Sequence, residues 1–268
     1  MRRNFLKIVG CLILCLVFLA APKNYKRWTH AFRPSKCLVD CPVHWKSVSP
    51  EKEILAVLER PFSYFDRGRQ CYVFLSEDQK YVLKLFRFDS CRIKTGSEIL
   101  NRVKKWVGAK ADEEMPFREN VLKTLGSCAL AYNKAKEQTG VVFIHLNLEE
   151  GGLPTLKIKD RLGRSFELDP SRYRFVLQKR ADGFRETLLH SQNREADIAS
   201  YRTLLKELKA LGLVHLDRTM GRNFGYLDGK AVLIDIGDLV YLPDQAEEEM
   251  AHFEIRFQSW LEKMEKEK

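Results

Sequence analysis

The sequence predicts an α+β fold with a β-rich first part and a mostly helical second part. Between residues 71 and 181, short apolar runs rich in Val, Phe, Tyr and Leu recur between polar turns, as in β-hairpins. Residues 195–211 and 246–268 instead carry apolar residues at the spacing of amphipathic helices. We therefore expect four divisions: an apolar N-terminal segment (1–22), a linker (23–50), a β-rich part (51–180) and a truncated helical part (181–268).

The composition is that of a globular protein with basic character. Of the 268 residues, 45% are hydrophobic and 31% are charged, which excludes a disordered chain. The net charge of +10 favours acidic partners such as nucleotides, nucleic acids or anionic lipid surfaces, or serves solubility alone. Cys37 and Cys41 form either a local disulfide or half of a metal site. No second Cys/His pair at zinc spacing supports the metal site.

The first 22 residues predict a membrane-directed segment. Arg2, Arg3 and Lys7 precede an apolar run at residues 8–21. That length suits a signal peptide better than a full span of about 20 residues. A small-x-small cleavage motif is missing before Pro22, which favours an uncleaved single anchor over export after cleavage. Positive residues after the run outnumber those before it, so the positive-inside rule puts the globular part on the cytoplasmic side.

The remaining elements follow from periodicity and turn residues. Helices are expected at 51–60, at 115–139 with Gly140 as the stop, at 195–211 with Gly212 as the stop, and at 246–268. Hairpins are expected at 71–86, at 156–168 and at 223–237, the last turning at Asp228-Gly229. Single strands are expected at 141–148 and 173–181.

Lys84 lies within the apolar run "YVLKLF". Strand alternation places Val82, Lys84 and Phe86 on one face, so a lysine there requires a partner unless it lies at a strand edge facing water.

The stretch "LVHLDRTMGRNFGYLDGKAVLIDIGDL", residues 213–239, contains the most specific pattern. His215 and Asp217 form a His-x-Asp, Asn223 follows six residues after the Asp, and Asp235 precedes Ile-Gly. A carboxylate ending an apolar strand is costly unless it is paired or binds a cation. The alternative is a polar loop between a helix and a hairpin that happens to contain acids.

In this order, the strand lysine, the His-x-Asp, the Asn and the Asp-x-Gly resemble the protein-kinase-like fold. The resemblance covers about residues 60–240 and is to short, divergent members such as the kinase-like proteins of chlamydia-type bacteria. It implies a two-lobed molecule that binds ATP and magnesium between a β-rich N-lobe and a helical C-lobe. It further implies that Lys84 binds phosphate, that Asp217 accepts the proton of the acceptor hydroxyl, and that Asp235 and Asn223 bind Mg²⁺.

Several positions depart from the family pattern. Only Gly68 and Val73 remain of the glycine-rich loop, because Asp66 and Cys71 stand where its outer glycines are expected. Asn223 lies one residue further from Asp217 than in the family, and residues 238–268 are too few for its helical subdomain.

The helix glutamate that pairs with the lysine in the family has three candidates here. They are Glu98, Glu119 and Glu137, and each has the alternative of an exposed helix glutamate.

These features predict a membrane-anchored minimal kinase-like phosphotransferase with an unknown acceptor. The first alternative is a catalytically inactive, pseudokinase-type module that binds a nucleotide or a protein. The second is a basic binder of polyanions or lipid surfaces, because "KNYKRW" and "NRVKKWVGAKAD" interleave Lys and Arg with Trp. Nucleic acid is the least favoured partner.

Overall fold

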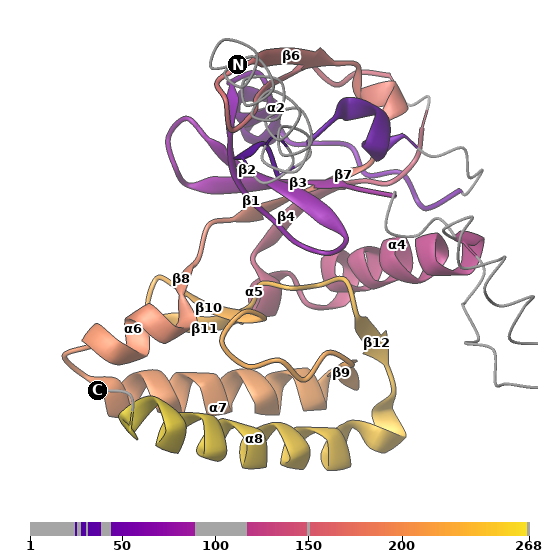
Figure 1. Cartoon of the computed structure of the whole chain (residues 1–268). Coiled ribbons are helices and arrows are strands. Elements are labelled where there is room, and N and C mark those ends of the chain that lie inside the picture. The colour runs from indigo at the N-terminus through magenta and orange to yellow at the C-terminus, as the bar shows by residue number, and fades with distance from the viewer. Residues whose placement is uncertain are drawn as a thin grey trace, which may run out of the picture.

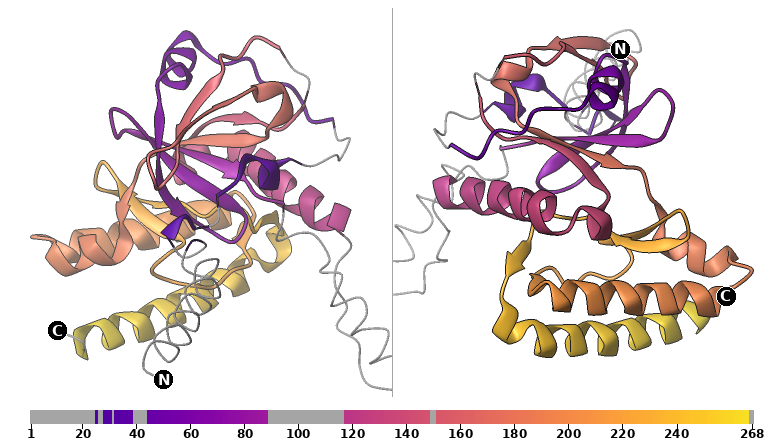
Figure 2. Two further views of the ribbon diagram at one scale, coloured as in Figure 1. Left: turned by 45° about the horizontal axis from the view of Figure 1, so that its top comes forward. Right: turned by 180° about the vertical axis from the view of Figure 1, so that it is seen from behind.

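A large sheet and a group of helices occupy opposite halves of the molecule (Figure 1). The computed structural model describes residues 25, 28–30, 32–38, 44–88, 117–148 and 151–266. The sheet half, within residues 62–179, and the helical half, residues 182–266, meet around α4 and α5 (Figure 2). This arrangement agrees with the α+β class.

The helices are of unequal length. The α-helices are α2 (Lys52–Leu58), α4 (Phe117–Lys134), α5 (Lys136–Thr139), α6 (Phe184–His190), α7 (Arg194–Ala210) and α8 (Ala246–Lys266). The 3-10 helices are η1 (Pro34–Cys37), η2 (Pro170–Arg172) and η3 (Pro243–Gln245). The helix predicted at 115–139 with Gly140 as its stop is confirmed over most of its length, but Ala135 leaves helical geometry (φ −141°, ψ 40°) and divides it into α4 and α5.

Three sheets contain the described strands. The large sheet has the order β4-β7-β3-β2-β1-β5-β6, antiparallel except for the parallel pair β1–β5. Its strands are β1 (Phe62–Arg67), β2 (Cys71–Ser76), β3 (Tyr81–Phe86), β4 (Val141–His145), β5 (Leu156–Lys159), β6 (Ser165–Leu168) and β7 (Phe175–Lys179). The small sheets are β11-β10-β8, formed by β8 (Asp182–Gly183), β10 (Phe224–Leu227) and β11 (Lys230–Leu233), and β12-β9, formed by β9 (Leu213–His215) and β12 (Leu239–Tyr241).

The two faces of the large sheet bury different cores. One face packs against α2 and the preceding segment, with Phe32, Leu83 and Leu85 fully or almost fully buried. Residues 32–38 and α2 therefore cover this face. The other face, including Phe86, joins α4, α7 and α8 in a second core that continues into the helical half. The predicted alternation along β3 is confirmed, because Leu83 and Phe86 belong to different cores.

The predicted hairpin in the helical half is confirmed, and its turn residues explain it. Asp228 and Gly229 both have positive φ (50° and 76°), the conformation that a two-residue turn between twisted strands requires. Gly225 on β10 is constrained in another way. An added Cβ would lie 2.7 Å from the Asp182 carbonyl oxygen, so only glycine lets β8 approach β10 this closely.

Candidate active site between the two halves

Lys84 projects from the centre of the large sheet toward the helical half. Its neighbours across the strands are Val73 on β2 and Val176 on β7. Its ammonium donates a hydrogen bond to the backbone carbonyl of Ile234, which lies 150 residues further along the chain. The strand lysine therefore has a partner, and that partner immediately precedes Asp235. The structure brings together Val73, Lys84 and the Asp-x-Gly segment.

Asp235, Ile236 and Gly237 form a tight turn directly after β11. The Gly237 N–H donates to Asp235 Oδ1 at 3.1 Å, so the carboxylate is held by its own turn. The Gln70 side chain, from the turn between β1 and β2, lies against Gly237, because a Cβ built there would overlap the Gln70 amide. This contact seats the turn between β1 and β2 on the Asp-x-Gly segment.

An ion pair joins Asp238, the residue after this turn, to α4. Lys123 Nζ lies 3.1 Å from Asp238 Oδ1. Helix α4 also packs along β12, which follows this turn in the chain. The sheet therefore contacts the Asp-x-Gly turn, and α4 contacts the residues that follow it.

The loop after β9 carries His215 and Asp217. His215 Nδ1 lies 2.7 Å from the Asp217 carbonyl oxygen. The Asp217 Oδ1 atom accepts hydrogen bonds from the Thr219 N–H (2.9 Å) and hydroxyl (2.6 Å). Partial burial raises the pKa of the Asp217 carboxyl, but the two bonds from Thr219, together with the nearby His215 and Asn223 side chains, hold the pKa below its ordinary value. Asp217 is therefore ionised at neutral pH.

Asn223 connects this loop to the Asp-x-Gly segment. Its side chain is 2% exposed, and its Nδ2 donates to the Asp217 carbonyl at 2.8 Å. Its own backbone carbonyl accepts from the N–H groups of Ile234 (2.7 Å) and Asp235 (3.1 Å). One buried residue thus fixes both predicted acidic positions, although it lies six residues after Asp217 rather than five.

The long C-terminal helix α8 supports the loop from the other side. Arg218 makes a bidentate ion pair with Glu249, with Nη2–Oε1 at 2.5 Å and Nε–Oε2 at 3.1 Å. Gly221 lies against Trp260, since a Cβ there would be 3.5 Å from the indole. Arg218 is therefore occupied in holding the loop to α8.

The remaining predicted site residues do not join this hydrogen-bonded group. Gly68 lies at the exposed tip of the turn between β1 and β2, where its N–H donates to the Cys71 carbonyl at 2.9 Å. Glu119 and Glu137 are exposed, and neither contributes a described ion pair to Lys84. Glu98 and Cys41 lie outside the described residues.

No acidic side chain was identified as a partner of Lys84 among the described residues. Two thiols lie near it instead. Burial raises the pKa of the Cys71 thiol to about 11, and Lys84 and Asp235 both lie within its electrostatic range. Burial also raises the pKa of Cys128, on α4, which senses the same two charges. Both thiols are therefore protonated at neutral pH. Neither Gln70 nor Cys128 was identified from the sequence, because neither belongs to a motif.

Other features of the described chain lie away from this site. A surface hollow of about 490 Å³ lies between α4–α5 and the C-terminal end of α7. Among the described residues, no group of three or more His, Cys, Asp or Glu side chains is placed to hold a metal ion. None of the described helices is long and apolar enough to cross a membrane, and the predicted anchor at 1–22 lies outside the described residues.

Comparison with solved structures gives distant structural likenesses. No protein-family model matches the chain, and no curated protein matches it in sequence. The crystal structure of monomeric WbdD is similar over 72% of this chain and 39% of that chain, with 18% identity and a TM-score of 0.40. A co-crystal structure of WbdD with the kinase inhibitor LY294002 matches over 67% of this chain and 33% of that chain, with 16% identity and a TM-score of 0.38.

Another structure describes WbdD as a bifunctional kinase-methyltransferase. This chain spans less than two fifths of the WbdD chains that it matches. WbdD is not one of the short kinase-like proteins of chlamydia-type bacteria, so that finer resemblance stays a prediction.

Proposed function

We propose that this protein is a kinase-like phosphotransferase that uses ATP and magnesium on an acceptor hydroxyl. One observation carries the proposal. Lys84 on the sheet half bonds to the carbonyl that precedes Asp235, and Asn223 ties Asp235 to the Asp217 loop. A fixed cation, a carboxylate for metal and a second carboxylate thus lie within one hydrogen-bonded unit, which is the equipment that phosphoryl transfer needs.

The donor set suits a magnesium–nucleotide complex. Mg²⁺ prefers oxygen ligands and is commonly held by one or two carboxylates together with phosphates. The Asp235 carboxylate and the Asn223 side-chain oxygen are such ligands, since the Asn223 amide nitrogen already bonds to the Asp217 carbonyl. When bound, the metal would neutralise phosphate charge. The exposed Arg69 side chain, in the turn between β1 and β2, would contribute a further phosphate contact.

Each protein residue then has a limited task. Lys84 supplies a positive charge from a rigid central strand, with Val73 beside it to contact the nucleotide. Asp217 accepts the proton of the acceptor hydroxyl, for which its lowered pKa keeps it ionised. Most of the rate would come from positioning and electrostatic stabilisation. The acceptor is open, and the predicted anchor at residues 1–22 would hold the enzyme at a membrane.

A second candidate is a pseudokinase-type binding module without chemistry. The Gln70 side chain rests against Gly237, where phosphates would have to enter, and Thr219 already occupies Asp217 Oδ1. In this interpretation the hydrogen bonds that join Lys84, Asn223 and the Asp217 loop only stabilise the fold. The two candidates differ in turnover, so a kinetic measurement separates them.

The test is phosphate release from radiolabelled ATP by the full chain, with and without magnesium. Asp217→Asn keeps the shape of the loop and removes the proton acceptor. We expect the variant to bind ATP with unchanged affinity and to lose about 10²–10⁴-fold in turnover. Thr203→Val, an exposed substitution on α7, is the control and should keep full turnover. Equal, background-level release by the wild type and Asp217→Asn would favour the binding module.

A further inference from the structure

A patch of exposed apolar and basic side chains lies around the turn between β5 and β6, at the end of the sheet where β1 leads into the turn between β1 and β2. We define the N-terminal patch as Tyr25, Trp28, His30, Arg67, Arg161, Leu162 and Arg164. Trp28, Leu162 and Tyr25 are 66%, 51% and 38% exposed and are among the most exposed large apolar side chains of the described chain. Large apolar side chains gathered in one place, with basic residues around them, mark an interaction surface.

Contacts between distant segments hold this patch together. Arg161 Nη1 lies 2.6 Å from His30 Nε2, and Arg67 Nη1 donates to the His30 carbonyl at 2.9 Å. The Arg164 guanidinium lies 6.0 Å from the centre of the Tyr25 ring. Tyr25 and His30 are thereby placed against the hairpin formed by β5 and β6.

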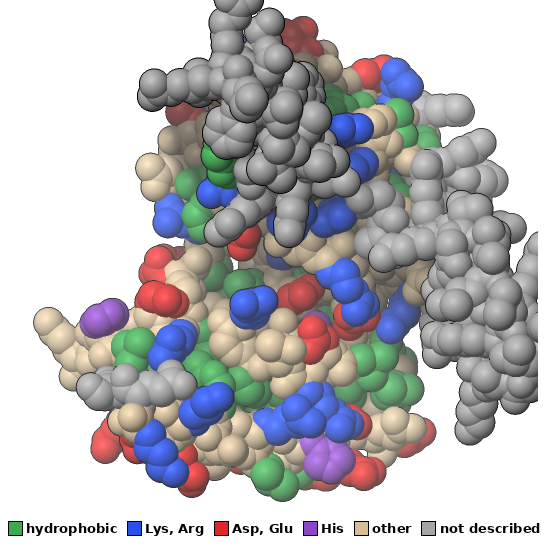
Figure 3. All heavy atoms as spheres, viewed as in Figure 1, with side chains coloured by type: hydrophobic (Ala, Val, Ile, Leu, Met, Phe, Trp, Pro, Cys, Tyr) green, Lys and Arg blue, Asp and Glu red, His purple; other side chains and the backbone are tan. Residues whose placement is uncertain are grey.

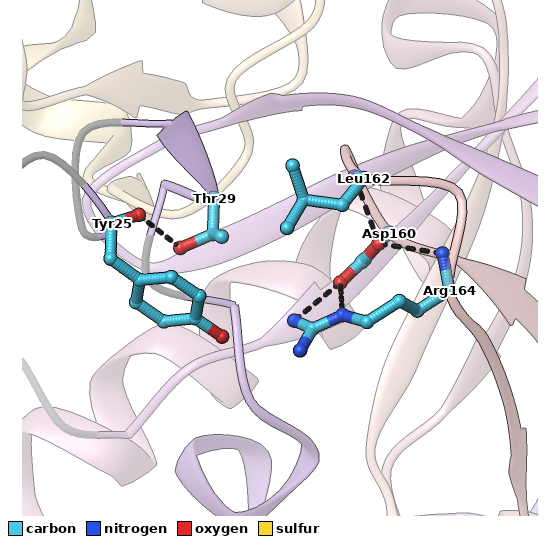
Figure 4. Close-up of polar contacts among 5 residues, drawn as sticks. All are labelled: Tyr25, Thr29, Asp160, Leu162 and Arg164. Atoms are coloured by element: carbon cyan, nitrogen blue, oxygen red, sulfur yellow. Dashed lines mark hydrogen bonds and ion pairs between the residues drawn. The ribbon is translucent and has the colours of Figure 1, made fainter.

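The hairpin turn presents its residues rigidly. Asp160 accepts hydrogen bonds from the N–H groups of Leu162 and Arg164, both at 2.9 Å, and from the Arg164 side chain at 2.7 Å (Figure 4). Thr29 bonds to the Tyr25 carbonyl through its hydroxyl at 2.8 Å. Figure 4 shows the Tyr25 ring beside the Arg164 guanidinium and Leu162 at the tip of the turn. The hydrogen bonds of the turn therefore hold Leu162 in its exposed position.

Burial and the nearby Arg161 and Arg67 guanidiniums lower the pKa of His30, and Arg164 is paired with Asp160, so the positive charge of the patch comes from Arg67 and Arg161. The exposed face of β5 adds Lys157 and Lys159, and the view in Figure 3 shows further Lys and Arg side chains over the sheet half. Aromatic rings, one aliphatic tip and arginines on one surface suit the boundary between lipid headgroups and acyl chains.

We propose that the N-terminal patch docks on an anionic lipid bilayer. Two observations favour this occupant over a protein. The patch is basic, as is the whole chain at +10, which complements anionic headgroups. It also begins only four residues after the apolar run at residues 8–21, so any membrane that holds this run lies within reach of the patch. The inference is independent of the proposed phosphotransferase activity.

The test is lipid photo-crosslinking by the full chain reconstituted in vesicles. Leu162 is replaced by the photo-crosslinking residue benzoylphenylalanine, and Ile255 is replaced likewise in a matched control. Ile255 is 67% exposed and lies on α8, at the opposite end of the molecule (Figure 1). In vesicles with about 30% phosphatidylglycerol we expect lipid adducts at position 162 and none at position 255. Equal yields at both positions, or none at 162, would overturn the proposal.

Charge dependence separates lipid docking from binding of a free anion. Removing one charge with Arg161→Gln should lower the docked fraction by up to about fivefold, whereas Lys263→Gln on α8 should leave it unchanged. Neutral phosphatidylcholine vesicles should give fewer adducts than anionic ones. Inorganic phosphate at matched ionic strength should not compete, and full competition by phosphate would show a site for free anions instead.

Discussion

Replacing Asn223 by alanine tests whether this residue joins the two acidic segments. The substitution removes the 2.8 Å hydrogen bond to the Asp217 carbonyl and a side chain that is 2% exposed. The carbonyl keeps its contact with His215 Nδ1, so it is not left without a partner. One lost hydrogen bond costs about 1 kcal/mol and the small cavity about as much again, giving about 2 kcal/mol.

For a chain of this size, that loss lowers the melting temperature by about 4–8 °C. Differential scanning calorimetry of the full chain measures it, with Asn133→Ala as the control because Asn133 is exposed on α4. A melting temperature of Asn223→Ala within about 1 °C of the wild type would refute the reasoning.

The remaining predictions concern the Asp217 carboxyl and the close strand pair in the helical half. Thr219→Val removes the 2.6 Å hydroxyl bond that helps to lower the pKa of Asp217, so carboxyl NMR titration should show a higher pKa. Because the native pKa is depressed, this bond stabilises the wild type at neutral pH. The stability gap between wild type and variant should therefore close as the pH falls through the native pKa. Gly225→Ala should destabilise the chain to urea by more than about 2 kcal/mol, because its Cβ would lie 2.7 Å from a carbonyl oxygen of β8, while Gly151→Ala, in open space, should have little effect.

The elements with clear periodicity or turn chemistry could be predicted from the sequence. The hairpin of β2 and β3, helix α7 with Gly212 after it, and helix α8 are where the pattern indicates. Strand β1 was not predicted, because its residues 63–67 are mostly exposed and lack the alternation of a half-buried strand. Strands β9 and β12 were not predicted, because each has three residues and depends on the other for pairing.

The candidate site could be predicted only in part. Lys84 and Asp235 are conspicuous as charged residues in apolar runs, whereas Asp217 and Asn223 were indicated by the resemblance to the order of the kinase-like motifs. The partner of Lys84 could not be predicted, because it is a backbone carbonyl and any residue supplies one. The loop between Asp217 and Asn223 is one residue longer than in the family. Its spacing did not reveal that the Asn223 side chain still reaches the Asp217 carbonyl, because this contact also involves a backbone carbonyl.

Binding of ATP to the full chain, with and without magnesium, tests the central claim most directly. Titration calorimetry compares the wild type with Lys84→Ala and Asp235→Ala, and with Lys263→Ala on α8 as the control. The account predicts magnesium-dependent binding to the wild type and the control, weakened about tenfold or more in both site variants, since each removes a charged contact to phosphate or metal. Absence of binding to a folded wild type, or binding that neither site variant weakens, would contradict it.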